Sequence, residues 1–140
     1  MRRGELLIVA VLMLILVGVF VGGVADERKR ERAVGEQAAV LQVAARNFCA
    51  QNNGVFAASL DDTTASGVTL RSLMPQDGVY KNPFTGEMVG PVDGKAETMG
   101  QVGYEPCYQD GKIIGCSITA WGRRHEIDIQ PPAPMHVLLI

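Results

Sequence analysis

The sequence predicts an α+β protein in which one long N-terminal helix packs on a small antiparallel sheet. Nineteen uncharged residues, Leu6–Val24, run into a charged segment that then carries a helical apolar stripe. Later in the chain, two runs typical of β-strands flank Asp110-Gly111, a dipeptide that favours hairpin turns. We therefore expect a helix with a membrane half and an amphipathic half, followed by a sheet.

Residues 1–25 are predicted to hold N-terminal leader residues and a transmembrane helix. As a helix, residues 6–24 would cover roughly 28 Å, close to the hydrocarbon thickness of a bilayer. A cleaved secretory signal is the alternative, because Arg2 and Arg3 resemble a positively charged n-region. The long apolar run favours a helix that stays in a membrane.

Residues 26–140 are expected to form one head domain. The interleaved charges from Asp26 to Arg32 suit a solvated helix. The predicted order in this domain is a helix over 26–53, a connecting loop over 54–100, antiparallel strands over 101–130 and a tail over 131–140.

An apolar stripe marks the second half of the helix. Its members recur at spacings of four and three, which places them on one helix face: Val34, Ala38, Leu41, Ala45 and Phe48. We expect a sheet to cover this face. A coiled-coil seam is the alternative, although the stripe is short and partly alanine. Asn52-Asn53-Gly54 supplies a left-handed helix stop.

Three strands are expected after the connecting loop: Val102–Gln109, Lys112–Trp121 and Glu126–Ile129. Pro106 cannot donate a ladder hydrogen bond, which predicts an edge or a bulge in the first strand. Prolines make the segment from Gln130 to Pro134 extended, and the apolar residues His136 to Ile140 have no evident role.

Two separate motifs resemble the type IV pilins and the pseudopilins of type II secretion. Arg3-Gly4 followed by Glu5 and an apolar helix resembles the N-terminal signature of that family, in which a prepilin peptidase cuts after the glycine. The segment Lys81-Asn82-Pro83-Phe84-Thr85-Gly86 resembles the loop that joins helix and sheet in many pilin-like proteins.

The resemblance implies roles for two residues near the N-terminus. Cleavage after Gly4 would make Glu5 the first residue, and methylation of the new N-terminus would follow. Glu5 would serve assembly, because the family's glutamate pairs with the N-terminal amine of a neighbouring subunit. The implied partners are prepilin peptidase, a membrane and other pilin or pseudopilin subunits.

The implied function is that of a structural subunit, a minor pilin or pseudopilin, in a type IV pilus or a type II secretion pseudopilus. Before assembly the chain would span the bacterial cytoplasmic membrane once, with its N-terminus in the cytoplasm and its head outside. The alternative is a single-pass membrane-anchored binding or scaffold domain that forms no filament.

Three cysteines, Cys49, Cys107 and Cys116, form no CxxC motif, so a structural disulfide is expected instead of a zinc site. A two-residue hairpin turn would pair Cys107 with Ile114. A four-residue loop would place Cys107 opposite Cys116, at the short Cβ separation that disulfides prefer. We predict the Cys107–Cys116 disulfide, with a Cys49 pairing as the alternative.

Catalysis and nucleic-acid binding have little support. His125 and His136 are isolated, and no nucleophile elbow or phosphate-binding loop occurs, so we expect neither an enzyme nor a cofactor. Asp93, Glu97 and Asp110 fit no EF-hand spacing, so no metal site is predicted. Residues 54–122 hold four basic and eight acidic residues, a balance that does not attract nucleic acid.

Overall fold

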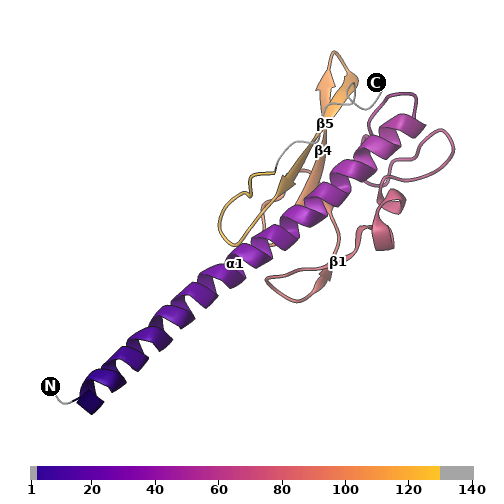
Figure 1. Ribbon diagram of the computed structural model, residues 1–140. Coiled ribbons are helices and arrows are strands. Elements are labelled where there is room, and N and C mark those ends of the chain that lie inside the picture. The colour runs from indigo at the N-terminus through magenta and orange to yellow at the C-terminus, as the bar shows by residue number, and fades with distance from the viewer. Residues whose placement is uncertain (1–2, 130–140) are drawn as a thin grey trace, which may run out of the picture. The chain divides into compact units, whose positions relative to one another are not determined.

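A computed structural model describes residues 3–129, with side chains from residue 26 onward. The chain divides into two compact units, residues 1–30 and 31–140, and each is described by itself. The predicted tail over 131–140 lies outside the described residues. The helix α1 comprises Arg3–Gln51, and the later elements are two 3₁₀ turns, Arg71–Leu73 and Pro75–Gly78, and five strands: β1 (Tyr80–Lys81), β2 (Met88–Val89), β3 (Val92–Asp93), β4 (Val102–Gln109) and β5 (Lys112–Ala120) (Figure 1).

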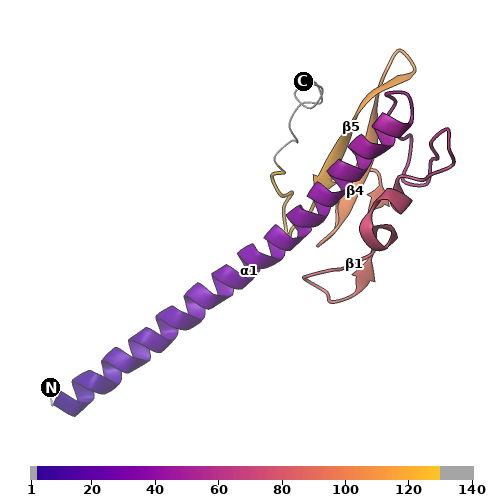
Figure 2. The same ribbon diagram turned by 45° about the vertical axis from the view of Figure 1, so that its right-hand side comes forward.

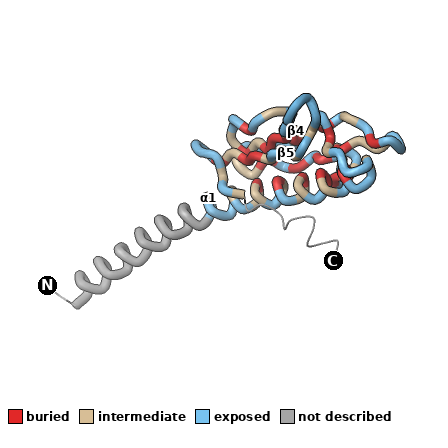
Figure 3. Tube along the Cα trace, turned by 90° about the horizontal axis from the view of Figure 1, so that it is seen from above, coloured by how far each residue is buried: buried red, intermediate tan, exposed pale blue. Residues whose placement is uncertain are grey.

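The predicted stripe of α1 is the centre of the hydrophobic core. All five of its residues are at most 1% exposed. Val102 and Tyr104 of β4, both buried, belong to the same apolar cluster, and β4 and β5 lie beside this part of the helix (Figures 1 and 3). A sheet therefore covers the stripe, as the sequence predicts.

The helix ends close to the predicted stop. The N–H groups of Asn52 and Gly54 both donate to the carbonyl of Cys49, at 3.2 and 2.9 Å. Asn53 and Gly54 have positive φ angles of 58° and 80°. This left-handed pair satisfies a terminal carbonyl and turns the chain away from the helix axis.

The β4–β5 hairpin forms at Asp110-Gly111 as predicted, but with a two-residue turn instead of the four-residue loop that the predicted disulfide required. Gln109 pairs with Lys112, and the turn residues Asp110 and Gly111 have φ angles of 51° and 75°. Two positive φ angles identify the type I′ turn that Asp-Gly favours. The expected third strand, Glu126–Ile129, contributes only a single bridge between Trp121 and Glu126.

The sheet is mixed rather than wholly antiparallel, because β3 pairs with β4 in parallel, with Val92 opposite Gly103. The strand order is β3-β4-β5, and β1 and β2 form a separate antiparallel pair. Glycine is required at position 103, since a Cβ there would collide with the carbonyl oxygen of Gly94 and the amide nitrogen of Ala96. The absence of a side chain at Gly103 lets the chain at Gly94 and Ala96, just after β3, pass close to β4.

The segment over 54–100 holds more regular structure than the loop that the sequence predicts. It contains both 3₁₀ turns and β1, β2 and β3, each strand only two residues long. Strands this short leave no periodic pattern to detect. Leu60, Leu70 and Met74 of this segment are buried in the same core, which β1 flanks (Figure 2).

The prediction of a membrane-spanning helix is corrected. Within the residues that the structure describes, no helix is long and apolar enough to cross a membrane. The part of α1 with described side chains begins with seven consecutive charged residues, Asp26–Arg32, which suit water rather than lipid. This finding contradicts the single-pass membrane location that residues 6–24 predicted. The structure does not describe the side chains of residues 6–24.

The buried stripe generates a stability prediction. Phe48→Ala should lower the free energy of unfolding by about 3–5 kcal/mol, the usual cost of emptying a buried aromatic site. Phe48 is 0% exposed, whereas Val43 on the same helix is 51% exposed. Val43→Ala is therefore the matched control, with an expected change within about 0.5 kcal/mol. Denaturant melts measure both, and equal losses would contradict the assignment of faces.

Candidate interaction surfaces

The two residues predicted to serve processing and assembly both lie in α1. Gly4 and Glu5 follow the helix start at Arg3. Their side chains are outside those that the structure describes, so their contacts stay untested.

The segment over residues 80–87 is organised by one buried asparagine. Asn82 is 5% exposed. Its Oδ1 accepts the N–H of Phe84 at 2.9 Å, and its Nδ2 donates to the carbonyl of Met99 at 2.9 Å. The backbone N–H of Gly86 donates to the Asn82 carbonyl at 2.8 Å, which closes the turn. Pro83 and Gly86 thus shape a loop that Asn82 fixes to the body of the protein.

A second anchor joins this loop to the sheet. The Tyr80 hydroxyl donates to the carbonyl of Gly100 at 2.8 Å, in a buried position. The Gly100 N–H in turn donates to the carbonyl of Trp121 at 2.9 Å. A Cβ at Gly100 would collide with the Asn82 side chain. Glycine at this position therefore lets the Asn82 side chain and the Tyr80 hydroxyl both bind the backbone of residues 99 and 100.

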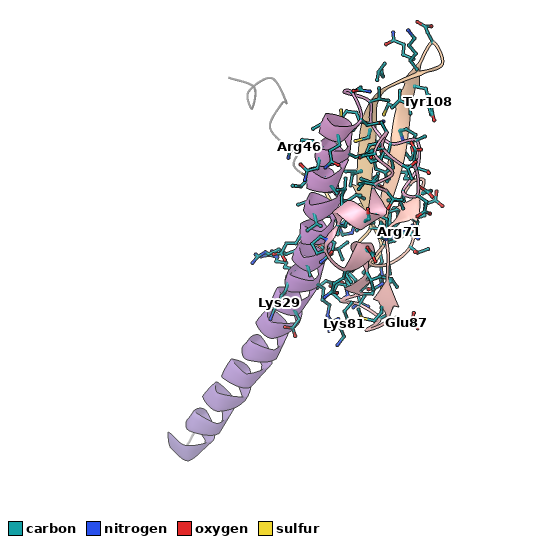
Figure 4. The ribbon with its side chains drawn as sticks, turned by 90° about the vertical axis from the view of Figure 1, so that its right-hand side faces the viewer. Lys29, Arg46, Arg71, Lys81, Glu87 and Tyr108 are labelled. Carbon is teal, nitrogen blue, oxygen red and sulfur yellow. The ribbon has the colours of Figure 1, made fainter. Side chains whose placement is uncertain are left out.

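The same arrangement brings Arg123 beside the loop. The Arg123 guanidinium lies 5.5 Å from the ring centroid of Phe84, within cation–π range. His125 Nε2 lies 3.6 Å from Glu31 Oε1. Lys81, Thr85, Arg123, Arg124 and His125 are exposed, and together they form what we call the loop-pair surface. Figure 4 labels Lys81 within it.

The exposed ion pair between Lys95 and Glu126 contributes little to stability. Lys95 Nζ lies 3.7 Å from Glu126 Oε2, and both side chains are about half exposed. Pairs of this kind are typically worth less than about 1 kcal/mol. Sequence reasoning missed the loop-pair surface because positions 84 and 123 are far apart in the chain and share no motif.

The predicted Cys107–Cys116 disulfide is wrong, because all three cysteines are free. Cys107 pairs with Gly115 and Cys116 with Pro106, so the two thiols occupy successive positions along the ladder. Side chains at successive positions point to opposite faces of a sheet. Accordingly, Cys107 is exposed while Cys116 is partly buried.

Two buried tyrosines and Cys116 have shifted pKa values. Burial raises the pKa of Tyr80 to about 12. Burial, with smaller contributions from nearby thiols, also raises the pKa of Tyr104, whose hydroxyl donates to the Ala57 carbonyl at 2.7 Å. Burial raises the pKa of the Cys116 thiol to about 11. These groups stay protonated at neutral pH, so the two tyrosine hydroxyls can donate their hydrogen bonds to the backbone.

The acidic residues weighed for calcium do not converge. Asp93 Oδ1 accepts the N–H of Leu60 at 2.8 Å, and Asp110 lies in the hairpin turn. Among the described residues, no group of three or more metal-ligating side chains is close enough to hold an ion.

Comparisons with known proteins give no family assignment. No protein-family model matches the chain, and no curated protein or solved structure is significantly similar to it.

The Asn82 anchor predicts a stability loss. Asn82→Ala should lower the free energy of unfolding by about 1–3 kcal/mol, because partly buried backbone groups at Phe84 and Met99 lose their partner. Asn52→Ala is the matched control, since its Nδ2 bond to the Val55 carbonyl is exposed. Chemical denaturation measures both variants, and an Asn82→Ala loss no larger than the control's would refute the anchor.

The Tyr80 pKa predicts a loss of stability in alkali. The unfolded chain releases this proton near pH 10 and the folded chain near pH 12. The stabilisation is therefore complete below pH 10 and is lost as the pH rises to 12. Tyr80→Phe should flatten this fall in the free energy of unfolding. An unchanged pH profile in Tyr80→Phe would contradict the assignment.

Proposed function

We propose that this protein is a structural subunit of a pilin-like filament, a minor pilin or pseudopilin, assembled through its N-terminal helix. The observation that carries the proposal is the division of α1. Among residues with described side chains, those of the helix that enter the core start at Val34. The uncharged run over 6–24 belongs to the separate first unit.

An uncharged helical run of this length needs apolar cover. Helices that are hydrophobic all round are buried in nature, because exposure of the apolar surface to water is unfavourable. Packing against the same run of other copies provides that cover in a filament. The resemblance of the Gly4-Glu5 signature and of the loop over 81–86 to pilins supports this mode of assembly.

The outer face of the head helix supports contact with neighbouring helices. Ala39, Val43, Asn47 and Ala50 recur there at spacings of three and four, and all are exposed. Small side chains such as Ala39 and Ala50 allow close helix packing.

Glu5 supplies the sharpest test. A carboxylate in an apolar helix bundle is costly unless a cation pairs with it, and the amine of a neighbouring N-terminus is the partner that the pilin resemblance implies. Glu5→Ala should therefore abolish filaments in electron micrographs while the head melts as in the wild type. Glu36→Ala, at an exposed position of α1, should assemble normally.

Two outcomes would contradict this proposal. Normal filaments from Glu5→Ala would show that assembly does not need the carboxylate. Mass spectrometry that finds an intact Met1 in the mature protein would exclude processing after Gly4. A helix-bearing binding domain that does not assemble would then be the better interpretation.

A further inference from the structure

The stop at the end of α1 contains an exposed asparagine–glycine pair. Asn53 and Gly54 are both exposed, and both have left-handed φ angles of 58° and 80°. Apart from the neighbours of Gly54 in the sequence, no described atom lies within 4 Å of the point that a Cβ on this residue would occupy. Solvent water and base can therefore reach the backbone between these two residues.

An asparagine that precedes glycine can lose its side-chain amide without an enzyme. The glycine nitrogen gives its proton to a base and attacks Cγ of the asparagine. The new N–C bond closes a five-membered succinimide ring, and the side-chain nitrogen takes a proton from water and leaves as ammonia. Water then opens the ring at either carbonyl, which gives aspartate or isoaspartate. Glycine permits this attack best, because it has no Cβ to obstruct it.

The sequence directs this reaction to one position. The chain holds four asparagines, and only Asn53 precedes a glycine. Asn82 precedes Pro83, whose nitrogen carries no proton to give up. Asn47 lies inside α1, and Asn52 precedes a second asparagine, whose side chain obstructs the attack. We therefore expect Asn53 to be the most reactive of the four when the chain is unfolded.

Two features of the helix stop oppose ring closure in the folded protein. The Gly54 N–H donates to the Cys49 carbonyl at 2.9 Å, so the attacking nitrogen keeps its proton and is held toward the helix. A left-handed residue such as Asn53 has a ψ of about +47°, which turns the following nitrogen away from Cβ. Ring closure therefore needs rotation about the Cα–C bond of Asn53, and this rotation breaks the hydrogen bond to Cys49.

We propose that Asn53 is a deamidation site whose reaction is controlled by opening of the last turn of α1. The ends of helices open at much lower free energy than the core of a fold, so the reaction follows this local opening and does not wait for global unfolding. The extent of deamidation then increases with the age of the molecule. The proposal goes beyond filament assembly and does not depend on it.

Both products weaken the end of the helix. Aspartate at position 53 adds a negative charge beside the last helix carbonyls, which form the negative end of the helix dipole. Isoaspartate adds a methylene group to the main chain, which moves the Gly54 N–H away from the Cys49 carbonyl. Three residues further on, the Ala57 carbonyl accepts the Tyr104 hydroxyl at 2.7 Å. Deamidation therefore loosens the segment that leads from α1 to its anchor on β4.

The first experiment incubates the full-length chain at mildly alkaline pH, with and without denaturing guanidinium chloride. Peptide mass spectrometry follows the conversion of each asparagine to an acid. In denaturant, Asn53 should react faster than the other three. Without denaturant it should react at least about tenfold more slowly, which corresponds to about 1.4 kcal/mol of protection. Equal rates at Asn53 under the two conditions would overturn control by the fold.

Two matched variants test whether the last turn controls the reaction. Ala50→Gly weakens that turn, because glycine is a poor helix former, and should accelerate the conversion of Asn53 about fivefold. Ala39→Gly makes the same change at an exposed position of α1 well before its end, and should leave the rate unchanged. Equal acceleration by both variants, or none by Ala50→Gly, would overturn the assignment to the last turn.

Asn53→Asp tests the effect of the reaction, because it carries one of the products from the start. Hydrogen exchange at the Gly54 amide should be faster in this variant than in the wild type, and the unfolding midpoint in denaturant should be lower. An unchanged exchange rate at Gly54 would contradict the proposed weakening of the helix end.

Discussion

Burial of one face of α1 under β4 is the interaction on which the rest of the head depends. The five residues of the stripe are almost fully buried, and Tyr104 opposite them is 0% exposed. Removal of this much apolar surface from water is the largest favourable contribution to folding a domain of this size. The Tyr104 hydroxyl also donates to Ala57, just after the helix. Tyr104 therefore packs on the buried face of α1 and also hydrogen-bonds the segment that follows the helix.

Two further anchors extend this core to the surface. Asn82 and Tyr80 bind the backbone at Met99 and Gly100, and Gly100 binds Trp121. Each polar group is buried with a partner, which makes its geometry specific. The loop-pair surface therefore rests on the same hydrogen-bonded framework as the sheet. Its exposed residues are held by a fixed scaffold.

The sequence was informative where a pattern repeats within one element. Spacings of four and three identified the buried stripe, and Asp110-Gly111 identified the position of the hairpin, although the predicted loop of four residues was too long. It failed where one residue changes a register, because the extra Ile114 sends Cys107 and Cys116 to opposite faces. It also failed for the parallel β3–β4 pair, which brings together strands too short to show periodicity. The expected membrane span rested on hydropathy alone, and the described residues do not support it.

The loop-pair surface was unpredictable for a related reason. Its residues lie in two loops, which the hydrogen bonds through Gly100 and the contact between Arg123 and Phe84 bring together. The resemblance to pilins covers the loop over residues 81–86 but does not indicate what that loop contacts. Long-range polar contacts of this kind leave no signal in a single sequence, whereas local turns and helix faces do.

Native-state hydrogen exchange tests most directly whether the α1 stripe and β4 form one cooperative unit. Amide groups from Val34 to Phe48 and from Val102 to Tyr104 should be the slowest to exchange and should share one opening free energy, that of global unfolding. Measurement by NMR on the full chain resolves each amide. If the helix amides opened at a free energy lower than those of β4 by more than about 2 kcal/mol, the helix would fold independently of the sheet, and the account would be contradicted.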